Sequence, residues 1–464
     1  MNISVFGCGY VGLTTAVGLA EMGNIVLGID VDEEKISMLK EGVVPFFEPG
    51  LQEMLVRQIG ESRLRFSTDF RLGIESGDII FSAVGTPPLK DHYADLSAVL
   101  HVAEIFRKYA SGEKIFINKS TVPIGTSDKI DEIINRRDNA RRAGRLQRKA
   151  SESRFHVVSN PEFLREGTAM KDFLEPDRIV IGLYEHDAAL QKIMKKLYRP
   201  MIERGVPLLF TDIRSAEVIK YASNAYLATR LSFVNELANF CEKAGADIQS
   251  VRAGVGLDKR IGTHYFQPGI GFGGSCLPKD LNALIEIGRR HEFEFEVLKA
   301  AQKVNQAQPG RLVAALKEVL PSLKGKTIAV WGTSFKPGTD DLRDAPSFVV
   351  LREVLREGAN IQVYDPVSLN NLQKIFGEKL TYSRDYYSAV KGADALLVLT
   401  EWDEFRNPDF GRMKALMKNY YILDGRNIFD REEVEKQGYY YYGIGSLSPV
   451  RKLKSRRSCV RLGL

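Results

Sequence analysis

Short apolar runs alternate with helical patterns of apolar residues in the first part of the chain. The run Ile3–Phe6 is followed by a glycine-rich turn, by a helical pattern over Leu13–Met22 that ends at Gly23, and by the run Ile25–Ile29. This order predicts a strand–helix–strand unit. Further strands are expected at Ile79–Val84, Ile115–Asn118, His156–Ser159 and Ile179–Gly182. Strands that alternate with helices in this way predict a parallel sheet with helices on both faces.

A long helical pattern covers Ile213–Ala244, 32 residues without Gly or Pro, and ends before Gly245. Apolar positions spaced by three and four predict one amphipathic helix of about 48 Å. The expected apolar stripe consists of Ile219, Ala222, Tyr226, Thr229, Phe233, Leu237 and Phe240. A helix of this length bridges domains or packs against its own copy, and we expect a homodimer held by it.

A second α/β pattern begins after the helical middle of the chain. Strand Thr327–Trp331, helix Ser347–Glu357 and strand Ile361–Tyr364 are expected, and then strands Ala395–Leu399 and Tyr421–Leu423. The predicted fold class is α/β, with two Rossmann-like doubly wound parallel-sheet domains joined by a long central helix and a helical middle region. The expected boundaries are 1–204, 205–310 and 325–445, followed by a basic tail over 446–464.

The net charge of +6 comes from two local segments. Residues 136–154 carry eight Lys or Arg against two acids, and residues 451–464 carry six without an acid, so the rest of the chain is net −6. A nucleic-acid-binding face normally lies on the folded body. We therefore interpret the two segments as a solvated loop and a tail, and expect no nucleic-acid partner.

Cysteine usage and hydropathy indicate a cytoplasmic protein. The four cysteines are scattered and form no metal-binding spacing, so no metal site is expected and a reducing compartment is indicated. The N-terminus has no basic segment of a signal peptide, and no run approaches the ~18 apolar residues of a membrane span. No membrane partner is expected.

The first glycine turn has the pattern of a dinucleotide site. Gly7, Gly9 and Gly12 lie between the first strand and the first helix, and Asp30 follows the second strand. The glycines permit a tight turn and a close approach of the pyrophosphate to the helix N-terminus. A carboxylate at Asp30 accepts ribose hydroxyls and repels a 2′-phosphate, which favours NAD over NADP.

Two later loops follow strands of the same predicted sheet. They are Val84–Pro88 and Lys119–Pro123, and loops at strand C-termini form the ligand crevice of an open sheet. Their Ser and Thr hydroxyls fit ligand contacts and turn formation equally well.

The segment Gly269–Asp280 has the pattern of a nucleophile site. Four glycines precede Cys276, and Pro278 is suited to the first turn of a helix. A cysteine at a helix N-terminus beside Lys279 favours the reactive thiolate. Asp280, one turn further on, is placed to hold a proton or a water. The alternative is a buried structural cysteine.

Together these motifs resemble the UDP-glucose/GDP-mannose dehydrogenase family, from Met1 to about Tyr442. The resemblance rests on Gly7-x-Gly9-x-x-Gly12, Ser120-Thr121-Val122, Asn160–Gly167, Lys220-Tyr221-x-x-Asn224, Gly273–Asp280 and Phe335-Lys336-x-Gly338–Arg343. It implies oxidation of a sugar's primary alcohol to a carboxylate with two NAD. Cys276 would attack the C6 aldehyde, and the thiohemiacetal would be oxidised to a thioester that water hydrolyses. Without the resemblance, Lys220 and Asn224 would be interpreted as surface residues.

The resemblance also implies roles for the other site residues. Lys220 would stabilise the oxyanion, helped by Asn224 and by a water that Asp280 holds, while Thr121 and Glu162 would position that water and relay protons. NAD would be held by Gly7, Gly9, Tyr10, Val11, Gly12, Asp30, Lys35, Thr86, Thr121, Glu166 and Arg343. The nucleotide-sugar would be held by Glu162, Phe163, Leu164, Lys220, Asn224, Arg260, Tyr265, Phe272, Gly273, Phe335 and Lys336.

The choice of substrate is less constrained than the chemistry. The segment Gly256–Gly262 looks more like the UDP-glucose branch, and UDP-glucose is the expected substrate; GDP-mannose, with the same mechanism, is the alternative. A two-electron hydroxyacid dehydrogenase of the 6-phosphogluconate type would not need Cys276. An NAD-sensing regulatory protein would need none of the Cys, Lys and Asp residues.

Overall fold

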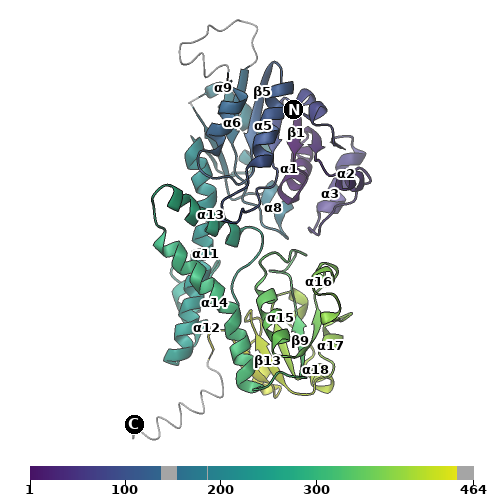
Figure 1. Cartoon of the computed structure of the whole chain (residues 1–464), viewed down its shortest axis with the longest axis vertical. Coiled ribbons are helices and arrows are strands. Elements are labelled where there is room, and N and C mark those ends of the chain that lie inside the picture. Colours follow the sequence, from purple (N-terminus) through teal and green to yellow (C-terminus); the bar gives the residue numbers. More distant parts are fainter. Residues whose placement is uncertain (137–153, 185–186, 447–464) are drawn as a thin grey trace. The chain divides into compact units, whose positions relative to one another are not determined.

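The structure is a computed structural model that describes residues 1–136, 154–184 and 187–446 (Figure 1). The chain divides into two compact units. The first consists of Met1–Ser223 with Glu286–Glu292, and the second of Asn224–Ile285 with the chain from Phe293 on. Most of the two basic segments lies outside the described residues, and the expected four-part division of the chain stays a prediction.

The first unit contains an eight-stranded sheet in the order β3-β2-β1-β4-β5-β6-β7-β8. Its strands are β1 (Asn2–Phe6), β2 (Ile25–Ile29), β3 (Leu64–Ser67), β4 (Ile79–Ser82), β5 (Glu113–Asn118), β6 (Arg154–Ser159), β7 (Ile179–Leu183) and β8 (Leu208–Asp212). The first six follow the strand order of dinucleotide-binding folds, which confirms the predicted fold class.

One junction of this sheet differs from the prediction, because β6 and β7 pair antiparallel at Ser159 and Gly182. Two antiparallel neighbours meet end to start, so the connection over residues 160–178 leaves and re-enters the sheet at the same edge. This is the edge where the parallel strands β1, β4 and β5 end. The connection is therefore held next to the loops of the expected ligand crevice.

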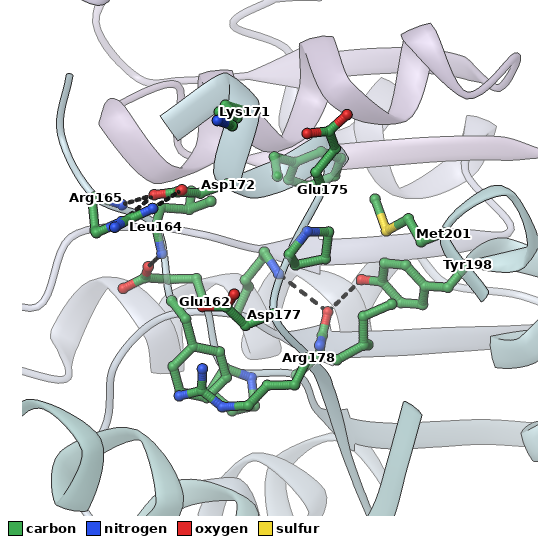
Figure 2. A pocket seen from close by; sticks show the side chains of 17 residues that line it. Glu162, Leu164, Arg165, Lys171, Asp172, Glu175, Asp177, Arg178, Tyr198 and Met201 are labelled. Carbon is green, nitrogen blue, oxygen red and sulfur yellow. Dashed lines mark hydrogen bonds and ion pairs between the residues drawn. The ribbon is translucent and has the colours of Figure 1, made fainter. Parts of the chain in front are cut away.

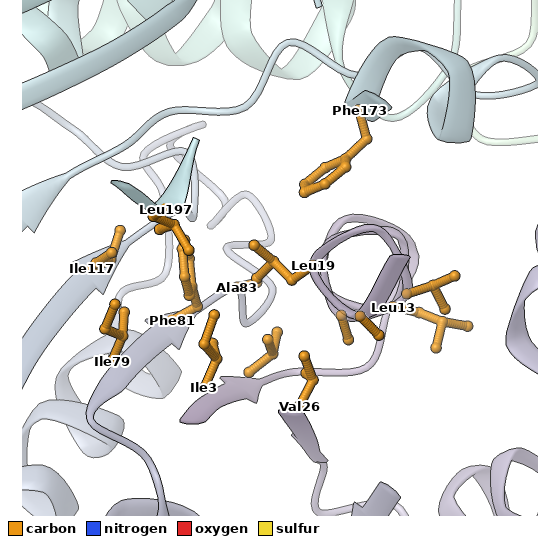
Figure 3. Close-up of a cluster of buried hydrophobic side chains, with 14 of the residues drawn as sticks. Ile3, Leu13, Leu19, Val26, Ile79, Phe81, Ala83, Ile117, Phe173 and Leu197 are labelled. Atoms are coloured by element: carbon orange, nitrogen blue, oxygen red, sulfur yellow. The ribbon is translucent and has the colours of Figure 1, made fainter. Parts of the chain in front are cut away.

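Helices cover both faces of this sheet. They are α1 (Tyr10–Glu21), α2 (Glu33–Lys40), α3 (Leu51–Gly60), α4 (Phe70–Ser76), α5 (Ser97–Tyr109), α6 (Thr126–Ile134), α8 (Ala169–Leu174), α9 (Ala188–Leu197) and α10 (Arg199–Ile202). Alternate strand residues enter different cores: Val5 and Phe81 pack with α1, whereas Phe6 and Ile80 pack with α5. Figure 3 shows the first of these cores around α1.

The second unit contains a six-stranded parallel sheet in the order β11-β10-β9-β12-β13-β14. Its strands are β9 (Thr327–Trp331), β10 (Asn360–Tyr364), β11 (Thr381–Tyr382), β12 (Ala395–Val398), β13 (Tyr421–Asp424) and β14 (Tyr440–Gly443). Its helices are α12 (Ile248–Gly256), α13 (Leu277–Arg290), α14 (Glu296–Val319), α15 (Pro346–Arg356), α16 (Leu369–Phe376), α17 (Tyr386–Ala389), α18 (Phe410–Leu416) and α19 (Arg431–Lys436), with short 3₁₀ turns at Gly377–Lys379 and Asp403–Phe405. The strand order repeats that of the first six strands of unit one.

The first turn of the second sheet resembles the NAD turn but is closed. Gly332 has φ +83°, and the Thr333 amide donates to Asp365 Oδ2 at 2.7 Å. The same carboxylate also accepts the amides of Ser334 and Ser368 and is 1% exposed. The Asp365 carboxylate is thus occupied by backbone amides of the protein. At this position, which corresponds to Asp30 in the first sheet, the carboxylate is not open to a ribose.

Helix α11 (Ile213–Ala244) has the bounds that the sequence predicts, and the division between the units falls inside it. The expected apolar stripe is not its buried side, since Tyr226, Phe233 and Phe240 are 64%, 56% and 62% exposed. Small residues such as Ala225 and Ala228 lie on the buried side instead, where they allow close packing. No helix among the described residues has the length and hydropathy of a membrane span.

The last turn of α13 belongs to the first unit, although the helix begins in the second. Arg290 forms an ion pair with Asp91 at 2.7 Å and lies 3.7 Å from the ring centre of Tyr93. It also pairs with Glu286 one turn earlier at 2.9 Å. These contacts fix the end of the helix to the loop that follows β4.

Candidate active site

The glycine turn between β1 and α1 fits a dinucleotide. Gly7 has φ +90°, and a Cβ on Gly12 would lie 1.6 Å from the Gly7 carbonyl oxygen, so both positions require glycine. Gly9 caps α1 without a side-chain hydrogen bond, and a Cβ there would meet nothing within 4 Å. The exposed amides of the first turn, with Tyr10 and Val11, are therefore open to a pyrophosphate.

Asp30 lies at the end of β2 and closes this turn. Its carboxylate accepts the Cys8 amide at 2.7 Å and the Lys35 ammonium at 3.1 Å. The structure thus brings together two residues predicted to hold NAD. The α2 N-cap Asp32 supports Lys35 by accepting its amide at 3.0 Å. The Asp32 amide also donates to Asp30 Oδ1 at 3.1 Å. A buried carboxylate with these three partners still has lone pairs for ribose hydroxyls.

The loops after β4 and β5 join at the same edge of the sheet. The Thr86 hydroxyl donates to the Thr121 carbonyl oxygen at 2.8 Å, and the Ser120 hydroxyl donates to the Val84 carbonyl oxygen at 2.7 Å. These bonds place Thr86 and Thr121 beside each other, as a shared cofactor contact requires. The hydroxyls therefore hold the two loops together, and their contact with a ligand stays a prediction.

The connection between β6 and β7 carries Glu162, whose carboxylate pairs with Lys220 of α11 at 2.6 Å. The two side chains are 6% and 4% exposed. Lys220 is thus a buried residue, not the surface residue that its helix position alone indicates. Phe163 lies beside the pair, with its ring centre 5.6 Å from Lys220 Nζ, and the Leu164 amide donates to Glu162 at 2.7 Å.

A cavity of about 280 Å³ opens next to this pair (Figure 2). Its wall includes three residues that sequence reasoning did not select, Lys119, Asn160 and Tyr198. The Lys119 ammonium and the Tyr198 hydroxyl both donate to Asn160 Oδ1, at 3.2 and 2.5 Å. The signal was present, since Lys119 precedes the Ser-Thr-Val motif and Asn160 begins the Asn-Pro-Glu motif.

Lys119 is a buried amine close to the Glu162–Lys220 pair. Burial lowers the pKa of its ammonium from the ordinary 10.5 to about 8, against the opposing attraction of Glu162. The positive charge of Lys220 acts in the same direction as burial. Two ammonium groups therefore lie near one buried carboxylate in the first unit.

In the second unit, Cys276 directly precedes α13, and its carbonyl oxygen accepts the Asp280 amide at 2.8 Å. The prediction that Cys276 lies at a helix N-terminus is confirmed. Asp280 is 1% exposed and accepts Asn224 Nδ2 and Lys279 Nζ, both at 2.6 Å. The Lys279 ammonium thus pairs with the carboxylate, and Cys276, half-buried, has the Ser275 hydroxyl 3.5 Å from its sulfur.

The glycine loop before Cys276 is fixed to the loop that follows β9. The Gly274 amide donates to the Arg343 carbonyl oxygen at 2.9 Å, and a Cβ on Gly273 would lie 2.2 Å from the Asp344 carbonyl oxygen. Phe335 packs against Gly274, with Lys336 Nζ 5.5 Å from its ring centre. The structure therefore groups these predicted ligand residues around the cysteine loop.

The remaining predicted residues have different surroundings. Phe272 is held through its backbone by the Asn305 amide group, with bonds of 2.8 and 3.0 Å. The Arg343 side chain is paired with Asp341 at 2.7 Å. Arg260 is an exposed side chain paired with Asp258 at 2.6 Å, and Tyr265 has φ +53°. Glu166 is buried in the loop after β6.

A dinucleotide-type sheet with an open glycine turn and a carboxylate after β2 is typical of the class of NAD-binding proteins. Three family models match the chain: the UDP-glucose/GDP-mannose dehydrogenase family NAD binding domain over residues 1–202, its central domain over 214–307 and its UDP binding domain over 329–431. The chain belongs to the UDP-glucose/GDP-mannose dehydrogenase family and is an NAD-dependent nucleotide-sugar dehydrogenase.

Individual relatives match the chain over nearly its whole length. It is 43% identical to UDP-glucose 6-dehydrogenase YwqF of Bacillus subtilis over 450 residues, 97% of this chain and 99% of that protein. Identity to UDP-glucose 6-dehydrogenase TuaD of the same organism is 42%, over 96% of this chain and 93% of the relative. A UDP-glucose dehydrogenase structure from Pyrobaculum islandicum superposes with a TM-score of 0.85 at 35% identity, covering 96% and 98% of the two chains.

Proposed function

We propose that the protein oxidises UDP-glucose to UDP-glucuronate, using Cys276 as a covalent nucleophile. The observation that carries the proposal is the placement of Cys276 at the start of α13, one turn before the buried carboxylate Asp280. The UDP-glucose 6-dehydrogenase relatives, aligned over 96–97% of the chain, support this substrate.

NAD, when bound at the glycine turn and Asp30, supplies the acceptor for a hydride in each of two oxidation steps. Cys276 Sγ adds to the C6 aldehyde and forms a thiohemiacetal, which the second oxidation converts to a thioester. Water then cleaves the C–S bond, leaving a carboxylate and regenerating the thiol. In sum, one alcohol, two NAD⁺ and one water give one carboxylate, two NADH and three protons.

The charged groups have roles that follow from their chemistry. The position of Cys276 at the helix N-terminus favours its thiolate form. Asp280, held by Asn224 and Lys279, keeps one orientation and can hold the hydrolytic water. Lys220 supplies a positive charge for the developing oxyanion, and Glu162, its buried partner, relays protons with Thr121.

The test is to count NADH formed per molecule of nucleotide-sugar consumed. We expect two NADH per UDP-glucose and no released aldehyde. One NADH per sugar would contradict the four-electron reaction. GDP-mannose is supplied separately at equal concentration, because it has the same C6 alcohol; a higher kcat/KM for GDP-mannose would retain the mechanism and reject the substrate.

A further inference from the structure

A buried carboxylate, Glu48, lies between the NAD turn and the loop after β6. It is 5% exposed and is located just before α3. Its Oε1 accepts the Ala169 amide at 2.7 Å, and its Oε2 accepts the Gly167 amide at 2.6 Å. The two oxygens therefore fix the end of the loop that carries Glu162 and Glu166 and the start of α8.

The same carboxylate accepts a hydrogen bond from the Tyr10 hydroxyl. Tyr10 is the first residue of α1, directly after Gly9, so its backbone belongs to the turn that fits a pyrophosphate. The Gly167 amide also donates to the Tyr10 hydroxyl oxygen, at 2.9 Å. Burial, and then the bond to Glu48, raise the pKa of the Tyr10 phenol, so it stays a donor.

A second contact joins the same two elements. Helix α8 packs on α1 through Phe173, whose ring occupies the space where a Cβ on Gly18 would lie, 2.1 Å from the nearest ring atom (Figure 3). This packing holds α8 against the body of α1, while Tyr10 and Glu48 hold the preceding loop against its first turn. The loop that carries Glu162 is thus held against α1 at two places, at Tyr10 and at Gly18.

We propose that Tyr10 and Glu48 are positioning residues that couple occupancy of the NAD turn to the placement of the Glu162 loop. A dinucleotide bound at the first turn of α1 restricts the motion of Tyr10. Because the Gly167 amide donates to both the Tyr10 hydroxyl and Glu48, the loop that carries Glu162 is then restricted as well. The Glu162–Lys220 pair is then ordered when cofactor is present. The inference rests on the proposed function, because Glu162 matters through the reaction assigned to it.

Two variants distinguish this coupling through Tyr10 and Glu48 from a purely structural role of the two residues. Tyr10→Phe keeps the ring, which packs 5.1 Å from the Phe46 ring centre, and removes only the hydroxyl. Glu48→Gln keeps the shape but leaves one acceptor for two amides, because the Gln nitrogen is a donor. Glu53→Gln is the matched control, since Glu53 is an exposed residue of the adjacent α3.

The experiment measures NADH affinity by fluorescence with and without UDP-glucose, a pair that cannot react further. We expect the parent and Glu53→Gln to show a coupling of at least about fivefold, and Tyr10→Phe and Glu48→Gln to show nearly none. We also expect kcat to fall about tenfold in both link variants. A Tyr10→Phe enzyme with the parent's coupling and a kcat within twofold would overturn the proposal, as would a parent without coupling.

A second measurement does not depend on the substrate. Hydrogen exchange of the Gly167 and Ala169 amides is followed with and without NAD in the folded proteins. We expect NAD to slow this exchange in the parent and not in Tyr10→Phe; equal slowing in both would overturn the link. A parent that binds NAD but does not oxidise UDP-glucose would reject the proposed function, while this exchange measurement would still decide the link.

Discussion

At the scale of single residues, the first unit concentrates buried charge around one carboxylate. Glu162 pairs with Lys220, and Lys119 lies nearby; within the described part of the chain its ammonium donates one hydrogen bond, to Asn160. An ammonium without full compensation is costly to bury. Such a cost is expected where positive charge serves chemistry, since it is available to an oxyanion without rearrangement.

The pKa of Lys119 gives a prediction for stability against pH. Because the ammonium titrates at about 8 when folded and at about 10.5 when unfolded, the unfolded chain holds more protons between these values, and stability rises with pH across this window. Between pH 8 and 10.5, the free energy of unfolding of the parent should rise by up to about 3 kcal/mol relative to that of Lys119→Met. Denaturant unfolding at each pH measures this difference. Lys40→Met, at an exposed position, is the control; curves for the parent and Lys119→Met that stay parallel would contradict the prediction.

Cys276→Ser should retain NAD binding and lose steady turnover. A serine ester forms less readily and hydrolyses more slowly than a thioester, so an adduct can accumulate. The measurements are NADH titration and steady-state kcat, with Cys241→Ser as the control because Cys241 is buried in the second core. Turnover of Cys276→Ser within tenfold of the parent, about 1.4 kcal/mol of barrier, would reject the covalent mechanism.

At the scale of elements, connections at the edges of the two sheets carry the candidate site residues. The loop before α13 approaches the connection between β9 and α15 so closely that Gly273 has no room for a Cβ. In the first unit, the antiparallel junction of β6 and β7 returns the chain to the ligand edge. In both cases candidate site residues lie on a connection whose ends are fixed by regular structure.

Gly273→Ala should therefore displace the cysteine loop. A Cβ 2.2 Å from the Asp344 carbonyl oxygen meets backbone, which cannot move without the turn around it. We expect kcat to fall by at least about tenfold with a smaller change in NAD affinity. Gly310→Ala in α14 is the control: a Cβ there meets nothing within 4 Å, and the change should stabilise by about 0.5–1 kcal/mol. Equal kcat in both variants would contradict the prediction.

At the scale of the whole molecule, the exposed side of α11 has the features of a protein–protein interface. Three exposed aromatic residues follow one another at intervals of seven residues, or about two helical turns: Tyr226, Phe233 and Phe240. They therefore lie in a row on one face of the helix. Aromatic residues aligned on an exposed helix face are typical of an interface. The expectation of a homodimer through α11 stays a proposal that this exposure supports.

Phe233→Asp should shift the protein from dimer to monomer, because burying a carboxylate in an apolar interface is strongly unfavourable. Sedimentation at micromolar concentration measures the state. Ile375→Asp is the control, an equally exposed apolar residue on α16, and it should leave the dimer intact. A parent that sediments as a monomer would refute the interface.

Patterns confined to one segment could be predicted from the sequence, while pairings between distant segments could not. Local periodicity and helix-ending residues predicted the bounds of α11, and the glycine spacing located the NAD turn. The buried side of α11 was missed because it combines small residues such as Ala225 and Ala228 with polar ones such as Lys220, and both carry little hydrophobic signal. Lys119 and Glu48 were missed because their partners are distant in the sequence: Asn160 lies 41 residues from Lys119, and Tyr10 and Gly167 lie 38 and 119 residues from Glu48. The short strands β3 and β8 were not predicted, because their positions at the two edges of the sheet depend on pairing with distant segments.

The return of Glu286–Glu292 to the first unit bears on how the chain is made. A ribosome that has released Ser223 has produced most of that unit but not Arg290, the partner of Asp91 and Tyr93. Translation adds residues at about 5–20 per second, so this part waits several seconds for its last turn of helix. Until then the loop after β4 lacks its contacts with Arg290, so we expect proteases to cut it more readily in the nascent chain than in the finished protein.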